Sequence, residues 1–172
     1  YTGAFKLRGA YYKISQLSEE EKAKGVIAAS AGNHAQGVAY AAQEMGIPAC
    51  IVMPKTAPIS KVEATRQYGV EVVLDGNNFD EAYQTARRIQ KETGATFIEP
   101  FNDIDIISGQ GTIALEILED LSDVDIIFVP VGGGGLAAGI AATIKSIKPD
   151  CQVFGVEATT AASMFESFRQ DC

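Results

Sequence analysis

The chain has 172 residues, of which 47% are hydrophobic and 21% charged, and its 14 basic and 22 acidic side chains give a formal net charge of −8. This composition is typical of a globular protein and excludes a disordered, collagenous or coiled-coil chain. No apolar run approaches the roughly 18 residues that a membrane helix needs, and the acidic balance disfavours binding to phosphate backbones. We therefore expect a soluble protein with no membrane and no nucleic acid among its partners.

Short β-branched runs alternate with longer amphipathic stretches along the chain. The runs with strand character cover residues 26–29, 50–53, 70–74, 96–98, 126–131 and 153–156. Their starts recur about every 20 to 30 residues, which is the length of a strand followed by a helix. This alternation predicts an α/β fold with a mostly parallel sheet.

Residues that cap or break helices mark the boundaries of the intervening helices. Ser18 with Glu19 to Glu21 indicates a capping box, Pro58 opens a helix that closes at Gly69, and Asn78 and Gly94 bracket another. We expect later helices to begin at Asp105 or Ser108, at about Leu136, and near Thr160.

Cysteine and histidine are too few for several common kinds of site. Cys50, Cys151 and Cys172 are far apart and odd in number, which fits neither a disulfide framework nor a metal site. We expect no metal and a reducing, cytoplasmic setting. A single histidine, His34, argues against a zinc site or a Ser-His-Asp triad.

The first candidate site is the segment from Ser30 to Gly37, SAGNHAQG, between a strand and a helix. Ligands of parallel sheets bind in such loops at the carboxyl ends of strands, and a helix start offers unpaired N–H groups to a carboxylate or phosphate. Asn33 has donor and acceptor atoms with which to orient a ligand. The alternative is that Ser30 or Asn33 is merely the helix N-cap.

The second candidate site is the glycine run from Gly132 to Gly135, followed by Leu136 and a helix. Its backbone N–H groups could form a phosphate-binding loop. Gly133, Gly135 and Ala138 also satisfy the GxGxxA pattern, with Glu157 about 20 residues further on, so a nicotinamide dinucleotide is an alternative ligand.

The third candidate is TGAFKLRGA, residues 2–10, although Lys6 alone would ordinarily be a solvated surface charge.

Together, in this order, TGAFKLRGA, SAGNHAQG and GGGGL resemble the pyridoxal-phosphate enzymes of fold type II, most closely the threonine and serine dehydratase branch. The resemblance covers essentially all 172 residues, including the EPFNDIDIISGQGT segment. It favours pyridoxal phosphate over NAD, because the first two motifs have no role in nicotinamide binding. The implied fold consists of two open, mostly parallel three-layer αβα lobes of the tryptophan synthase beta type.

The resemblance implies a role for each motif. Lys6 would form the Schiff base with the cofactor and, once freed by substrate, remove the Cα proton; Phe5 would be a further cofactor contact. Asn33 would bond to the cofactor's ring hydroxyl. Two stretches complete the site, the substrate-carboxylate loop Ser30, Ala31, Gly32, Asn33 and His34, and the phosphate loop Gly132, Gly133, Gly134, Gly135 and Leu136.

The implied reaction is β-elimination, which converts L-threonine to 2-oxobutanoate and L-serine to pyruvate, with release of ammonia. Leu7 and the GGGGL form favour dehydratases over sulfhydrylases and threonine synthases. Ala31 stands where related serine racemases carry a catalytic Ser, so we expect weak racemase activity. A biosynthetic dehydratase, serving isoleucine biosynthesis, and a catabolic one both fit the resemblance.

The resemblance also bears on domain organisation. The family's catalytic domain is nearly twice as long, so we expect a truncated chain in which residues 25–104 form the small lobe and residues 1–24 and 105–172 are part of an incomplete large lobe. The family's partner of the pyridine nitrogen lies further along than Cys172. An unfinished sheet edge at 126–156 predicts a homo-oligomer. The alternatives are a non-catalytic fragment that binds only phosphate or another anion, a serine racemase-like enzyme and an NAD-dependent oxidoreductase.

Overall fold

A computed structural model describes residues 1–170 of the chain, and Cys172 lies outside the described residues. The chain divides into two compact units, Tyr1–Glu99 and a second that begins at Pro100. Each unit is described by itself. The expected assignment of 1–24 and 105–172 to one lobe and 25–104 to the other stays a prediction.

The first unit alternates helices with parallel strands, which confirms the α/β class. In chain order its elements are α1 (Lys6–Ser15), α2 (Glu19–Lys24), β1 (Val26–Ala29), α3 (Asn33–Met45), β2 (Ala49–Met53), α4 (Ile59–Arg66), β3 (Glu71–Leu74), α5 (Phe79–Thr93) and β4 (Thr96–Phe97). The strands form one parallel sheet in the order β3-β2-β1-β4, with Val26 of β1 aligned to Ala49 of β2 and Thr96 of β4.

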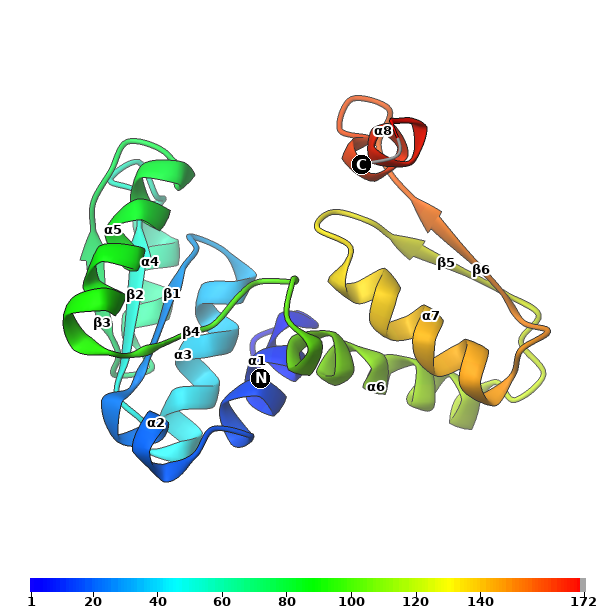
Figure 1. The fold of residues 1–172 in the computed structure, drawn as a ribbon, viewed down its shortest axis with the longest axis horizontal. Coiled ribbons are helices and arrows are strands. Elements are labelled where there is room, and N and C mark those ends of the chain that lie inside the picture. The colour runs from blue at the N-terminus through cyan, green and yellow to red at the C-terminus, as the bar shows by residue number, and fades with distance from the viewer. Residues whose placement is uncertain (171–172) are drawn as a thin grey trace. The chain divides into compact units, whose positions relative to one another are not determined.

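Helices cover both faces of this sheet, and β1, one of its two inner strands, is apolar throughout. All four residues of β1 are buried. Ile27 and Ala29 pack in a core cluster with Ala82 and Ala86 of α5. Alternate residues of a strand point to opposite faces, and α3 packs on the other side of β1 and β2 (Figure 1). The unit therefore has three layers.

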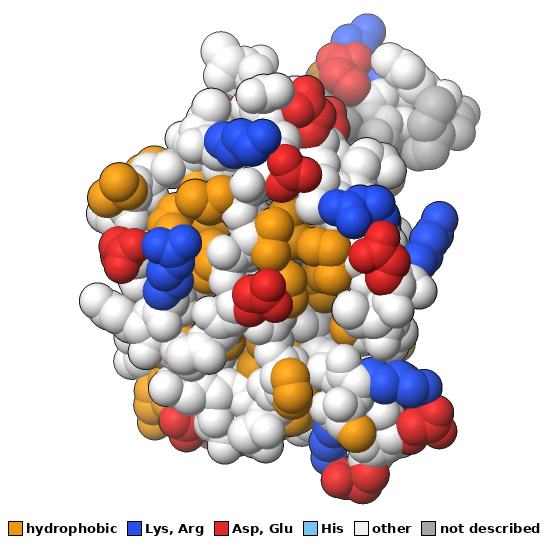
Figure 2. Space-filling model, turned by 90° about the vertical axis from the view of Figure 1, so that its left-hand side faces the viewer, with side chains coloured by type: hydrophobic (Ala, Val, Ile, Leu, Met, Phe, Trp, Pro, Cys, Tyr) orange, Lys and Arg blue, Asp and Glu red, His pale blue; other side chains and the backbone are white. Residues whose placement is uncertain are grey.

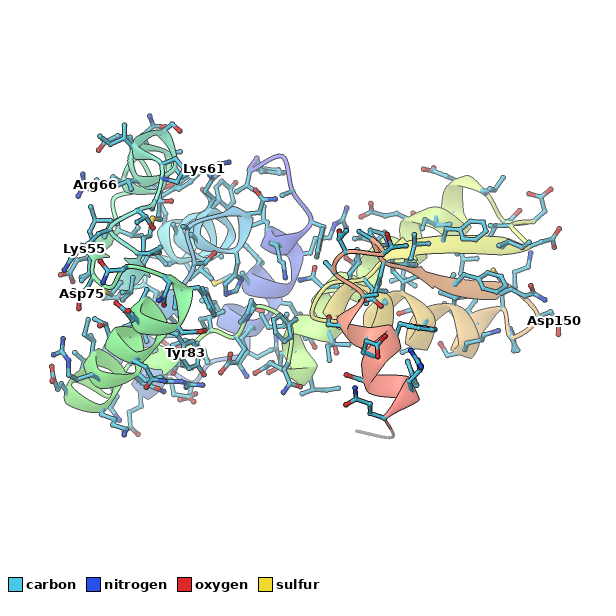
Figure 3. The ribbon with its side chains drawn as sticks, turned by 90° about the horizontal axis from the view of Figure 1, so that it is seen from above. Lys55, Lys61, Arg66, Asp75, Tyr83 and Asp150 are labelled. Atoms are coloured by element: carbon cyan, nitrogen blue, oxygen red, sulfur yellow. The ribbon has the colours of Figure 1, made fainter. Side chains whose placement is uncertain are left out.

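The loops at the carboxyl ends of β2 and β3 are bonded to each other. The Asp75 N–H donates to the Met53 carbonyl at 2.9 Å, and the Lys55 N–H donates to the Gly76 carbonyl at 2.8 Å. Lys55 Nζ also lies 3.2 Å from Asp75 Oδ1, and Figure 3 shows the two side chains together. The carboxyl edge of the sheet, where parallel sheets bind ligands, is thus held in place.

Helix boundaries follow the capping residues only in part. The capping box of Ser18 and Glu21 is present, and Asn78 caps α5, which ends at the left-handed Gly94. The predicted starts at Asp105 or Ser108 are wrong, because Asp103 caps the next helix by accepting hydrogen bonds from two backbone N–H groups. The last helix begins at Ser163 rather than near Thr160.

The second unit has a two-stranded parallel sheet and three helices among the described residues. They are α6 (Ile104–Asp120), β5 (Ile126–Pro130), α7 (Gly135–Ile147), β6 (Gln152–Val156) and α8 (Ser163–Arg169). α7 packs on both strands and lies alongside α6. The other face of the sheet exposes apolar side chains, with the rings of Phe128 and Phe154 stacked at a centroid distance of 5.6 Å.

The surface carries both signs of charge. On the side of the first unit shown in Figure 2, basic and acidic side chains are interspersed around hydrophobic ones, and no basic patch forms there. In the first unit some charges pair along a helix, as Arg66 does with Glu63 at 2.9 Å and Arg88 with Glu92 at 3.1 Å. Within residues 1–170, no helix combines the length and hydrophobicity needed to cross a membrane.

Candidate active site

Lys6 is the first residue of α1, a helix that the sequence analysis did not predict. Its N-cap is Phe5, which makes no side-chain capping bond, and Lys6 Nζ lies 5.3 Å from the centroid of the Phe5 ring. Burial lowers the pKa of the Lys6 amine from its ordinary value. A lysine desolvated in this way is more readily deprotonated, which is the state in which an amine acts as a nucleophile or base.

Gly37 brings α1 against α3. A Cβ at Gly37 would lie 3.0 Å from the Leu7 nitrogen and 3.1 Å from the Lys6 carbonyl carbon, closer than side chains normally approach backbone. A glycine inside a helix costs about 1 kcal/mol of stability relative to alanine, and the close packing of α1 on α3 that glycine allows offsets this cost. Gly37 closes the SAGNHAQG motif, and a glycine inside a helical pattern is the sequence signal that could have predicted this contact.

The loop after β1 leads directly into α3. Gly32 is the N-cap, and Ser30 Oγ accepts a hydrogen bond from the Gly32 N–H at 3.2 Å. The alternative that Ser30 or Asn33 caps the helix is therefore wrong, since Asn33 is its first residue. With no side-chain cap on α3, the N–H groups of its first turn are available for an anion.

His34 sits at this helix start with its ring buried. Its Nε2 lies 2.9 Å from the Ile98 carbonyl oxygen, which can only accept, so Nε2 carries the proton. Burial is the main cause that lowers the His34 pKa to about 4, and the positive charge of Lys6 lowers it further. The ring is thus neutral near pH 7. The charge of Lys6 acts on the His34 ring, so Lys6 and the start of α3 lie near each other within the first unit.

The glycine run lies in the second unit, between β5 and α7. Gly134 is the N-cap of α7 with φ +85°, a backbone conformation that favours glycine. A Cβ at Gly132 would have no atom within 4 Å. Gly132 thus presents open backbone just before the N-terminus of α7, which has no side-chain cap and carries Leu136 in its first turn.

These residues fit the chemistry of pyridoxal phosphate. A desolvated amine at Lys6 can bond to its aldehyde, and glycine backbone at a helix N-terminus suits its phosphate. The free Cys50 is unsuited to serve as a second nucleophile, because burial raises the pKa of its thiol to about 11.

The chain belongs to the family of pyridoxal-phosphate dependent enzymes, whose sequence pattern matches residues 1–172. Membership confirms the cofactor and the fold type that the three motifs predict. It also favours pyridoxal phosphate over the nicotinamide cofactor that the GxGxxA spacing had left open.

Within this family, the chain is similar to threonine ammonia-lyases, threonine deaminases and serine racemases. The chain is 60% identical over 169 residues to L-threonine ammonia-lyase of Thermotoga maritima, a match that covers 98% of this chain and 42% of that protein. The processed form of threonine deaminase isoform 2 from Solanum lycopersicum superposes with a TM-score of 0.95 at 51% identity, covering 98% of this chain and 49% of that one. Maize serine racemase also gives 0.95, at 42% identity, with 99% and 52% covered. The chain spans about half the length of these relatives.

Proposed function

We propose that the chain carries the lysine, the substrate-carboxylate loop and the phosphate loop of a threonine ammonia-lyase, an enzyme that converts L-threonine to 2-oxobutanoate and ammonia, and L-serine to pyruvate and ammonia. The observation that carries the proposal is the packing of Gly37 against the backbone of Lys6 and Leu7, because it fixes a desolvated amine beside the N-terminus of α3.

Lys6 supplies the amine. Because its pKa is lowered by burial, a larger fraction is deprotonated near neutral pH than for a surface lysine. With the cofactor present, the deprotonated Nζ would be the group that holds it, and once the substrate amine has taken its place the freed Nζ would accept the proton from the Cα of the substrate. Phe5, whose ring lies beside Nζ, limits the positions that the amine can take and is a further cofactor contact.

The loop Ser30, Ala31, Gly32, Asn33 and His34 binds the substrate carboxylate. The positive end of the α3 dipole and the N–H groups of its first turn attract an anion, and a neutral His34 adds no competing charge. The exposed Asn33 amide extends from the same helix start and orients the cofactor ring through a hydrogen bond.

The phosphate loop comprises Gly132 to Gly135 and Leu136, and its backbone N–H groups hold the cofactor phosphate. Pyridoxal phosphate, when bound, supplies an electron sink that stabilises negative charge at the substrate Cα. The protein's residues position the reacting atoms and move the proton.

We further propose that the protein acts as a homo-oligomer in the cytoplasm. The thiols of Cys50 and Cys151 are free, as is usual in a reducing compartment. The exposed apolar face of β5 and β6, which includes Phe128 and Phe154, is a candidate interface between copies. On the face of the first unit shown in Figure 2, acidic and basic side chains are mixed, and no basic patch that could bind nucleic acid is seen there.

The test adds pyridoxal phosphate to the chain and measures the near-visible absorbance that the cofactor acquires when it bonds to a lysine. Borohydride then fixes the bond, and mass spectrometry locates it. We expect the added mass on the peptide that contains Lys6. Lys6→Ala should abolish it, whereas Lys13→Ala, in the last turn of the same helix, should leave it unchanged.

Two outcomes would favour the alternatives. A folded chain that shows no label on Lys6 but binds inorganic phosphate would be a non-catalytic anion-binding fragment. If NAD instead protects the chain against unfolding, and pyridoxal phosphate leaves no label on Lys6, the oxidoreductase would be supported.

A further inference from the structure

Phe101 packs directly on the glycine run. A Cβ at Gly133 would overlap Cδ1 and Cγ of Phe101 and lie 2.6 Å from Cε1. A Cβ at Gly135 would meet the Phe101 main chain, 2.9 Å from its carbonyl oxygen and 3.0 Å from its Cα. Because the contact includes Cγ, which lies on the axis of rotation about the Phe101 Cβ–Cγ bond, turning the ring about that bond does not relieve the overlap; the ring must change rotamer about the Cα–Cβ bond, or the backbone must shift.

Three of the four glycines are therefore explained by the protein itself, for two different reasons. Gly133 and Gly135 make room for Phe101, whereas Gly134 adopts a positive φ. Neither reason applies to Gly132, because its φ is not positive and a Cβ there would stand in open space. Only the backbone at 132 is left without a protein neighbour that explains the glycine, as expected where a ligand approaches.

Phe101 is itself held at the head of α6. The side chain of Asp103 accepts hydrogen bonds from the backbone N–H groups of Asp105 and Ile106 at 2.8 and 3.2 Å, which fixes the turn after Phe101. Further along, α6 and α7 cross closely, because a Cβ at Gly139 would lie 2.7 Å from the Gly111 nitrogen. α6 and α7 thus approach through a glycine contact along their length, and the segment before α6 meets the glycine run through Phe101.

We propose that Phe101 is a positioning residue for the phosphate loop: its ring and backbone fill the space beside Gly133 and Gly135 and thereby set the path of the backbone that binds the cofactor phosphate. The inference rests on the proposed role of the run as the phosphate site. It assigns to Phe101 a function in ligand binding although the side chain need not touch the ligand.

The test is a double-mutant cycle of Gly133→Ala and Phe101→Ala, with Gly132→Ala as the matched control. Each variant is measured by thermal unfolding and by titration with pyridoxal phosphate, followed by absorbance, and with inorganic phosphate. We expect Gly133→Ala to lower the Tm by about 5 °C and to weaken phosphate binding about tenfold, because the added methyl overlaps the ring.

Phe101→Ala should rescue Gly133→Ala, so that the double variant unfolds at a higher Tm and binds phosphate more tightly than Gly133→Ala alone. Phe101→Ala by itself should weaken phosphate binding, because the loop loses its support. Gly132→Ala should leave the Tm unchanged and weaken only the binding, and Phe101→Ala should not restore it.

Additive effects in both measurements would overturn the inference, since they would show that Phe101 and Gly133 do not act together. Coupling in the Tm with no coupling in phosphate affinity would also overturn it, leaving Phe101 a purely structural residue. If the unmutated chain binds neither phosphate nor pyridoxal phosphate, the proposed function fails and the positioning role fails with it. If the effects of Gly133→Ala and Phe101→Ala on the Tm were still non-additive, the failure would lie in the proposed function and not in the packing of Phe101 on the glycine run.

Discussion

The imidazole of His34 donates a hydrogen bond through Nε2 to the carbonyl oxygen of Ile98, 64 residues further along the chain, at 2.9 Å. This bond joins the start of α3 to the segment that leaves β4. The Ile98 N–H in turn donates to the Ile27 carbonyl at 2.9 Å. The loop that we assign to the substrate carboxylate is therefore fixed to the sheet through a buried neutral histidine.

The first prediction concerns stability against pH. The His34 pKa is about 4 in the folded chain against an ordinary value of 6.5, so the unfolded chain binds more protons between these values. The free energy of unfolding should therefore be highest above pH 6.5 and fall as the pH drops towards 4, by up to about 3 kcal/mol. Urea unfolding across this range measures the effect.

His34→Gln provides the control, because its amide can still donate to Ile98 but does not titrate. Since His34 is the single histidine, the slope between about pH 5 and 6.5 should largely vanish in this variant. An unchanged slope would show that another group carries the dependence.

The second prediction concerns Gly37. Gly37→Ala places a methyl group against the backbone of Lys6 and Leu7, so α1 must shift. We expect the free energy of unfolding to fall by about 1 to 2 kcal/mol, since overpacking outweighs the better helix propensity of alanine. The label on Lys6 after borohydride should also decrease, because its amine moves from its position beside α3.

Gly32→Ala is the matched control for stability, because a Cβ at that position would have no atom within 4 Å and its φ is not positive. It should unfold as the unmutated chain does. Equal loss in both variants would mean that the helix contact at Gly37 is not the cause.

A third prediction tests the choice between lyase and racemase. Ala31 cannot exchange a proton, so a full-length chimera, in which this chain is completed by the remainder of a dehydratase relative, should form D-serine slowly if at all. Ala31→Ser should increase D-serine formation relative to pyruvate formation, as measured by chiral chromatography. Fast D-serine formation by the unmutated chimera would instead support the racemase assignment.

The fourth prediction concerns self-association. Phe128 is 68% exposed and Phe154 is 45% exposed on one face of the second unit's sheet. We expect the chain to associate at high concentration in light scattering, and Phe128→Glu to shift it towards monomer. Ile59→Glu, at an 81% exposed position of the first unit, should have no such effect. A chain that stays monomeric at high concentration would count against this interface.

Elements with local end signals could be predicted closely from sequence. β1 has the predicted bounds, and α5 lies between Asn78 and Gly94 as expected, because a side-chain cap and a left-handed glycine act within a few residues. α1 could not be predicted in this way. It has no side-chain cap and no acidic residue in its first turn, and it packs on α3 through Gly37.

The same distinction applies to the candidate site. The three motifs pointed to a lysine, an anion-binding helix start and a glycine loop, since these depend on residue type and order. Phe101 carries no comparable signal, because its role depends on a contact with Gly133, a residue more distant in sequence than any local pattern reaches. The bond between His34 and Ile98 was missed for the same reason.

The strand order β3-β2-β1-β4 has one more consequence. From β1 the chain adds β2 and then β3 on one side, and it returns to the other side of β1 as β4. The direction in which strands are added therefore reverses at β1, so the position between β1 and β4 is a topological switch point. Doubly wound sheets place their binding crevices there. The Ser30–His34 loop leaves β1 at this point, and Ile98 leaves β4 beside it. Substrate preference could therefore diverge through these two connections while the strands keep their register.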